Sequence, residues 1–156
     1  MLIYCRSGPK KPSEMTQSFS AQVRNWTEKA KRNAGLVVAD AAQGVFADMS
    51  QRQPSVKETG GTFEIGKVPV DTGLLINSML TTLNGGALGS GPDAYIAGLA
   101  GFELGDSIVH AFTQEYASAI EYGTGNMPGR FMVREAINGA GGWQARVDAS
   151  AAKFQD

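Results

Sequence analysis

The chain has 156 residues, of which 42% are hydrophobic and 19% are charged, and its net charge is −1. This length fits one domain with a sizeable core. The single cysteine, Cys5, excludes an internal disulfide, and with the single histidine, His110, it leaves too few soft ligands for a zinc site. We therefore expect no metal and no cofactor. The sequence has no apolar run near the ~20 residues of a membrane-spanning helix, so we expect no membrane partner and use on the cytosolic side.

The charges are distributed unevenly along the chain. Residues 1–35 carry a net charge of +5, and the remainder is acidic. Residues 68–129 contain no Lys or Arg but do contain Asp71, Asp93, Glu103, Asp106, Glu115 and Glu121. A surface built from this segment would repel phosphate. Nucleic-acid binding by the basic N-terminal part is a separate hypothesis, but a helix rich in Lys and Arg is more often a solvated face.

The N-terminal part predicts an arm and one long helix. Residues 1–15 have no hydrophobic period and are expected to form a flexible arm, followed by a single domain over residues 16–156. From Ser18 to Gln51 the apolar residues step by three and four, which predicts one helical face. At 1.5 Å per residue this helix would be ~50 Å long, more than the core needs. We expect it to lie across a sheet and consider an overhang into a neighbouring subunit, with a bend or close contact at Gly35 and Gly44.

The next segment predicts short elements. Pro54 is expected to stop the helix, and residues 55–67 to form a polar loop with a short strand at Thr62–Ile65. Asp71 is placed to cap a helical turn through its carboxylate, and residues 79–83 are expected to be extended. The residues of this turn that we expect to face inward are Leu74, Leu75 and Met79.

The middle of the chain is rich in glycine. Residues 84–92 contain four glycines, so we expect a mobile loop. Residues 94–102 and 107–112 alternate and carry β-branched or aromatic side chains, which predicts two strands joined as a hairpin by the turn-like residues 103–106. The helix and these strands predict an α+β fold, with a long helix packed on a small antiparallel sheet and shorter helices closing it.

The C-terminal part predicts a turn between helices. Gly123 is expected to end a helical turn that begins at Tyr116, and Gly129 to let the chain enter a second helix after Pro128. The apolar stripe of that helix is expected to be Phe131, Val133, Ala136 and Ile137. After the break at residues 138–142, a last amphipathic helix needs a partner surface and carries the stripe Trp143, Val147, Ala151 and Phe154.

Two motifs stand out in this order. The first is Asp-Thr-Gly-x-Leu-x-x-Ser, and the second is Tyr-Ala-x-x-x-Glu-Tyr-Gly-Thr followed by an Arg-Phe corner. Their conjunction after a long N-terminal helix resembles the tail-completion, or neck, proteins of lambda-like long-tailed bacteriophages. The residues that carry the resemblance are Asp71, Thr72, Gly73, Leu75, Ser78, Tyr116, Ala117, Glu121, Tyr122, Gly123, Thr124, Arg130 and Phe131.

The resemblance implies a non-enzymatic structural protein of the virion. Such a protein would form part of the head–tail junction, as a neck or tail-terminating ring of six or twelve copies, and would assemble in the host cytoplasm. Its partners would be copies of itself and other neck, connector and tail-tube proteins. Genomic double-stranded DNA would pass through the lumen without specific binding, and the acidic segment 68–129, if it lines that lumen, would keep the DNA from sticking.

Enzymatic readings have weaker support in the sequence. Asp71-Thr72-Gly73 is also the active-site tripeptide of aspartic proteases, and a homodimeric protease is the alternative function. Leu74 and the helical pattern after it argue against that reading, and inhibitor-sensitive peptide cleavage lost in Asp71→Asn would establish it. A triad of His110, Glu115 and Ser107 lacks a strained nucleophile turn, and the glycine-rich loop lacks the Lys-Ser/Thr of a phosphate cradle.

Glu121 is the acidic residue of the second motif. If its helical turn packs inward, the carboxylate needs hydrogen-bond donors. The nearest candidates in the sequence are Arg130, Arg134 and the amides around Gly123 and Thr124. We expect Glu121 to be a structural anchor of the corner rather than a catalyst.

Overall fold

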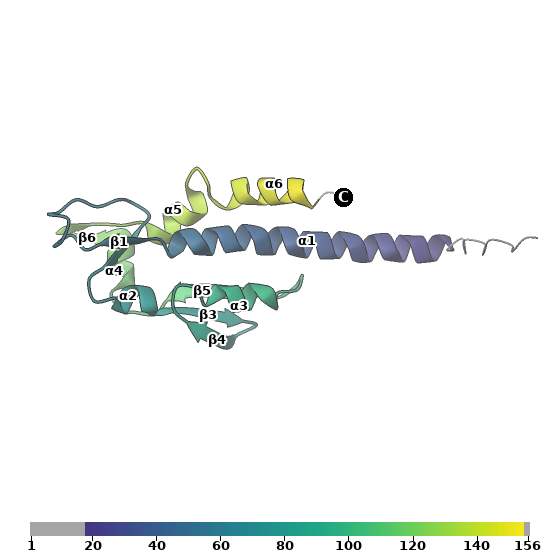
Figure 1. The fold of residues 1–156 in the computed structure, drawn as a ribbon, viewed down its shortest axis with the longest axis horizontal. Helices are drawn as coiled ribbons and strands as arrows, with labels where there is room; N and C mark the ends of the chain where they lie inside the picture. Colours follow the sequence, from purple (N-terminus) through teal and green to yellow (C-terminus); the bar gives the residue numbers. More distant parts are fainter. Residues whose placement is uncertain (1–17, 155–156) are drawn as a thin grey trace, which may run out of the picture.

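The structure of the chain is a computed structural model that describes residues 18–154. The arm expected at residues 1–15 lies outside this range. Helix α1 (Phe19–Met49) runs through the molecule, with α5 (Met132–Asn138) and α6 (Trp143–Lys153) on one side. On the other side lie α3 (Tyr95–Ala100) and a three-stranded sheet (Figure 1). The fold is α+β, as the sequence predicts.

The main sheet is antiparallel and has the order β4-β3-β5. Its strands are β3 (Met79–Leu83), β4 (Gly86–Ser90) and β5 (Ile108–Phe112). In the register Met79 pairs with Phe112 and Thr81 with His110, so these residues share the face that is turned toward α1. The core behind this face consists of Val45, Met49, Val68, Leu75, Ile76, Met79, Met132 and Ala136.

Helix α1 covers nearly the same residues as the helix predicted over 18–51. Its buried residues are in the C-terminal half, where Ala41, Val45 and Met49 repeat at four-residue steps. The helix ends at Met49, before Pro54, and the hydroxyl of its C-cap residue Ser50 lies 2.9 Å from the carbonyl oxygens of both Phe46 and Pro92. Gly44 provides the expected close contact: a Cβ there would lie 2.1 Å from the Arg146 guanidinium of α6.

Three polar contacts join helix α6 to α1. Arg146 pairs with Asp48, and Asp40 accepts hydrogen bonds from Ser150 and, at 2.8 Å, from Lys153. These hydrogen bonds lower the pKa of Asp40, the one from Lys153 most. The partner surface that the sequence requires for this last helix is therefore the chain's own α1.

The segment between residues 84 and 102 differs from the prediction. The glycine-rich loop expected at 84–92 instead contains β4, and the strand expected at 94–102 is helix α3, so β5 pairs with β3 and not with a preceding hairpin strand. Tyr95 and Gly98, one helical turn apart, are both buried. A Cβ at Gly98 would lie 2.8 Å from Ile108, so the glycine allows the helix to approach the sheet closely.

The segment between α1 and β3 also differs. The strand expected at Thr62–Ile65 does not form in the described structure; instead β1 (Arg52–Pro54) pairs in parallel with β2 (Val68–Val70). Helix α2 (Leu74–Asn77) is one turn long, and the residue at its N-cap is Gly73, with a φ of 79°. Asp71 therefore does not cap it and pairs with Lys57 at 3.1 Å. Leu74 is exposed, and Ile76 is buried in its place.

The corner after α4 (Ala117–Tyr122) contains a small hairpin, β6 (Gly123–Thr124) with β7 (Met127–Pro128). Gly123 ends α4, as predicted. The left-handed residue before α5 is Phe131, with a φ of 52°, and not Gly129. Gly129 is needed for close approach instead, since a Cβ there would lie 2.7 Å from the Glu121 carbonyl. The buried face of α5 is Met132 and Ala136, so the stripe predicted for that helix is wrong at Phe131 and Ile137.

Candidate functional site: the corner between the two motifs

The second motif folds into a corner in which the end of α4 and the start of α5 lie side by side. The amide of Arg130 donates to the carbonyl of Ile120 at 2.8 Å, and the amide of Phe131 donates to that of Glu121 at 3.0 Å. The hairpin β6–β7 closes the loop between them. The two glycines of this corner allow the two backbone segments to approach closely, because a Cβ on Gly123 would lie 2.6 Å from the Gly129 amide.

Glu121 caps helix α5 from the neighbouring helix α4. Its side chain is 6% exposed and accepts hydrogen bonds from the amides of Val133, at 3.1 Å, and Arg134, at 2.9 Å. Amides in the first turn of a helix have no partner within the helix, so an acceptor from outside stabilises that end. Of the donors considered from the sequence, Arg134 contributes, but through its backbone and not its guanidinium.

Arg130 is the most unusual residue of the corner. It is 4% exposed, and its guanidinium carbon lies 3.4 Å from the centroid of the Phe63 ring. Its Nε and Nη1 atoms are buried and have no hydrogen-bond partner among residues 18–154. The sequence placed Arg130 near Glu121, but it could not show that loop 55–67 folds back to put Phe63 against it.

The two motifs meet at a pocket of about 320 Å³. Asp71, Thr72, Gly73 and Leu75 of the first motif line it, together with Tyr116 and Arg130 of the second. The hydroxyl of Ser78 binds the carbonyl of Leu75 at 2.7 Å and so completes α2. The other motif residues lie around the corner: Ala117 packs against the core, whereas Tyr122 and Thr124 are exposed.

The Asp71 carboxylate of the protease-like tripeptide lies at the surface. It forms an ion pair with Lys57 and follows the short parallel strand β2. An aspartic protease requires two such carboxylates sharing one proton, so a second copy of the chain would have to bring its own Asp71 into contact. Within one chain the tripeptide serves to connect β2 to α2.

His110 is buried in the sheet and not part of a triad. Its Nδ1 lies 2.8 Å from the hydroxyl of Thr81, on the neighbouring strand. The rings of Phe46 and Tyr95 both pack against it, with centroids 5.2 and 5.3 Å from that of the histidine and 5.7 Å from each other. This apolar environment lowers the pKa of His110, because burial disfavours the imidazolium form.

The free energy of unfolding is therefore expected to fall as the pH drops below about 6.5, the usual histidine pKa. Between the lowered folded pKa and this value the unfolded chain binds more protons, so stability rises with pH in that window. Each unit between the two pKa values contributes about 1.4 kcal/mol. Urea unfolding from pH 7.5 to 5 measures the slope. His110 is the only histidine in the chain, so the slope should disappear in His110→Gln, and its persistence there would assign it to other groups.

The N-terminal end of α1 projects from the rest of the molecule (Figure 1). The contact between Asn33 and the carbonyl of Phe154 marks the end of α6, and residues 19–27, here called the projecting segment, extend beyond it. Phe19, Val23 and Trp26 lie four and three residues apart on this segment and are 82%, 45% and 71% exposed. They continue the apolar spacing of the buried half of the helix. The sequence predicts this stripe, and the overhang is the alternative that the length of the helix left open.

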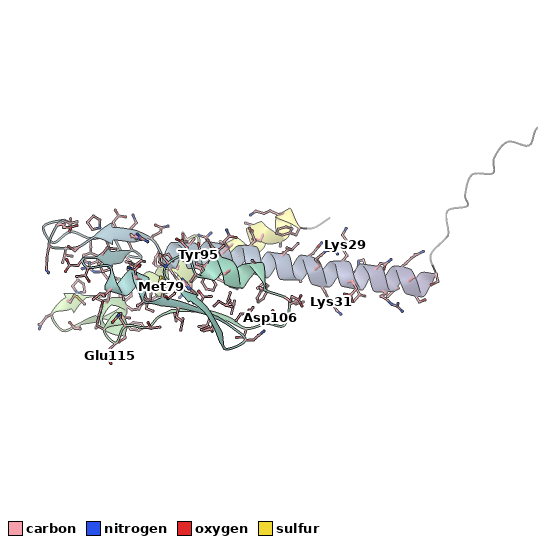
Figure 2. The ribbon with its side chains drawn as sticks, turned by 60° about the horizontal axis from the view of Figure 1, so that its bottom comes forward. Lys29, Lys31, Met79, Tyr95, Asp106 and Glu115 are labelled. Atoms are coloured by element: carbon pink, nitrogen blue, oxygen red, sulfur yellow. The ribbon has the colours of Figure 1, made fainter. Side chains whose placement is uncertain are left out.

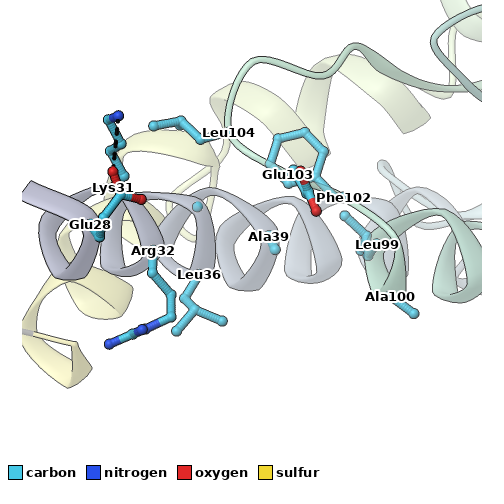
Figure 3. Close-up of a pocket in the computed structure, with 11 residues that line it drawn as sticks. Glu28, Lys31, Arg32, Leu36, Ala39, Leu99, Ala100, Phe102, Glu103 and Leu104 are labelled. Carbon is cyan, nitrogen blue, oxygen red and sulfur yellow. Dashed lines mark hydrogen bonds and ion pairs between the residues drawn. The ribbon is translucent and has the colours of Figure 1, made fainter. Parts of the chain in front are cut away.

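A groove of about 710 Å³ lies at the base of the projecting segment (Figure 3). Leu36 and Ala39 of α1 form one wall, and Phe102 and Leu104, after α3, form the other. Lys29 and Lys31 lie on α1 next to the projecting segment, whereas Asp106 and Glu115 lie on the body of the molecule (Figure 2). The hydrogen bond from Asn84 lowers the pKa of Asp106.

Residues 18–154 contain no group of three or more His, Cys, Asp or Glu side chains placed to hold a metal ion. In the same range no helix combines the length and the apolarity needed to cross a membrane. Comparisons with protein-family models, with curated proteins and with solved structures found no match.

Proposed function

We propose that the chain is a non-enzymatic structural subunit of the head–tail junction of a tailed bacteriophage. The phage assignment rests on the resemblance carried by the two motifs. The observation that carries the structural role is the projecting segment, on which Phe19, Val23 and Trp26 are exposed together. Clustered exposed apolar side chains of this kind are typical of protein interaction sites. The motif residues support the same role, because Glu121 and its neighbours stabilise a corner of the fold.

The assembly we propose is a ring of identical copies. In such a ring each subunit presents one surface to the next copy and receives a different surface from the previous one. The projecting segment and its base are basic, with Arg24, Lys29, Lys31 and Arg32 against Glu28. The region 68–129 has no basic residue, so the projecting segment of one copy is complementary in charge to this region of the next.

The sheet offers a second contact to neighbours. Strand β4 is exposed along its length, and within the described residues β3 is its only strand partner. Unpaired edge strands without charged side chains accept strands from other chains. Neck, connector and tail-tube proteins are the further partners of this proposal, which places the chain in the virion after assembly in the host cytoplasm.

The role of the acidic segment in the lumen also remains a proposal. Asp93, Glu103 and Glu115 are exposed, Asp71 is exposed but paired with Lys57, and Glu121 is buried. The exposed acids are the ones that would repel passing DNA. A ring structure with these three residues on its outer wall would refute this role.

Electron microscopy of the purified chain, combined with depletion of the chain from assembling phage, tests the proposed function. Rings of uniform diameter are expected in the purified protein or on addition of tails. Particles assembled without the chain should accumulate as separate heads and tails. Normal joining and infection by particles that lack the chain would overturn the proposal, and peptide cleavage that depends on Asp71 would replace it with the protease.

A further inference from the structure

The pocket between the two motifs is lined by Arg130, and two nitrogens of its guanidinium have no hydrogen-bond partner among residues 18–154. The backbone of Arg130 is fixed, because its amide donates to Ile120 and its carbonyl accepts from Gly66 at 2.7 Å. The side chain stacks on Phe63, and the residue is only 4% exposed. Its Nε and Nη1 atoms have no partner in the described part of the chain.

The orientation of the guanidinium suits a planar oxyanion. Stacking on Phe63 occupies the face of the group and leaves its edges for hydrogen bonds. A carboxylate can bridge a guanidinium along the edge of Nε with Nη2 or along the edge of Nη1 with Nη2. Each edge includes one of the two unpartnered nitrogens. Two parallel hydrogen bonds of this kind are the usual geometry of an arginine–carboxylate pair.

A second unpartnered group lines the same pocket. The hydroxyl oxygen of Ser55 is buried and has no hydrogen-bond partner within residues 18–154. Ser55 and Arg130 both line the 320 Å³ pocket, and Val56, Leu75 and Ile120 provide apolar walls. A pocket with apolar walls and a few convergent polar groups is the usual form of a small ligand site.

We propose that this pocket binds a carboxylate, with Arg130 as the charged donor and Ser55 as a second donor. The apolar walls fit the carbon chain that carries the carboxylate. Asp71 at the same pocket is paired with Lys57, so Arg130 is the charged group left for the ligand. Burial lowers the pKa of Arg130, and an anion in the pocket offsets that cost of burial. The carboxylate comes either from a free small molecule or from an acidic side chain of another copy, and the proposal does not depend on the phage assignment.

Acetate is the probe that tests the site. Thermal unfolding of the chain is measured in sodium acetate, sodium phosphate and sodium chloride at equal ionic strength. We expect acetate to raise the midpoint by about 4 °C at ten times its dissociation constant, and chloride to have no such effect. In the folded protein, acetate should also shift the ¹⁵N resonance of Arg130 Nε, a readout that needs no variant.

Matched variants locate the effect. Arg130→Lys keeps the positive charge but loses the guanidinium edges, and we expect it to lose the acetate response. Arg134→Lys is the control, because Arg134 is exposed and lies over Phe131 outside the pocket; it should keep the response. An acetate effect no larger than that of chloride, a response retained in Arg130→Lys, or a larger effect of phosphate would each overturn the assignment.

The source of the carboxylate is decided by the oligomeric state. If saturating acetate dissociates self-associated protein, and Arg130→Lys does the same, the natural ligand is an acidic side chain of a second copy. If acetate binds at Arg130 without changing association, the ligand is a separate molecule. Either result supports the site, and neither depends on whether the chain joins heads to tails.

Discussion

Replacing Glu121 with alanine is expected to lower the free energy of unfolding by about 3 kcal/mol. The carboxylate is buried and accepts two backbone hydrogen bonds from the first turn of α5. Hydrogen bonds to a charged group contribute roughly 1.5–3 kcal/mol each, and the variant leaves both amides without this partner. Urea unfolding at pH 7.5, followed by circular dichroism, measures the change.

Two further variants separate the contribution of the Glu121 cap to stability from the effect of removing any carboxylate. Glu121→Gln keeps the shape and one acceptor oxygen, so we expect about half of the loss. Glu115→Ala removes an exposed carboxylate from the preceding loop and should change the unfolding free energy by less than about 0.5 kcal/mol. Equal stability of Glu121→Ala and Glu115→Ala would show that the cap contributes nothing.

The second large effect that we expect is a loss of affinity between copies of the chain when Trp26 is replaced. Trp26→Ser should weaken association between copies by about 30-fold or more, because an aromatic anchor at the centre of an interface commonly contributes at least ~2 kcal/mol. The fold should remain intact, since Trp26 is 71% exposed and lies beyond the body of the molecule. Sedimentation velocity over a range of concentrations gives the dissociation constant.

Tyr122→Ser is the matched control for this variant. Tyr122 is also aromatic and also 71% exposed, but it is the last residue of α4, which lies at the opposite end of the molecule. If the projecting segment carries the interface, Tyr122→Ser leaves the dissociation constant unchanged. An unchanged constant in Trp26→Ser would remove the projecting segment from the assembly surface and, with it, the main structural support for the proposed ring.

The long helix could be predicted because Phe19, Val23 and Trp26 continue a period that is unbroken through Met49, whereas its overhang was only one of two possibilities. Residues 94–102 could not be assigned in the same way, since a short apolar run fits a strand and a helix equally well. In the structure the helix packs closely against the sheet, with Gly98 next to Ile108. This contact joins residues that are distant along the chain, so the local sequence pattern could not reveal it. The spacing placed Asp71 just before α2, but it could not show that Gly73 would stand at the N-cap and that Asp71 would pair with Lys57.

The candidate site could be predicted only in part. The sequence identified Glu121 and Arg130 as the polar residues of the corner, because both stand in a motif next to glycines. The partners of Glu121 are backbone amides of α5, which have no signal in the sequence. Phe63 and Ser55 were missed because both lie in a polar loop without hydrophobic period, and only the folded chain brings that loop over the corner.

The seam between α6 and α1 has a consequence for the dynamics of the molecule. Its ion pairs, Arg146 with Asp48 and Lys153 with Asp40, are partly exposed and weaken as salt screens them. Ser150 is the only residue of α6 in the most buried class, and the apolar residues Val147 and Ala151 are only half-buried. Helix α6 is therefore the element that can detach as a unit while the body stays folded, and its amide protons should exchange with solvent ahead of those in β3.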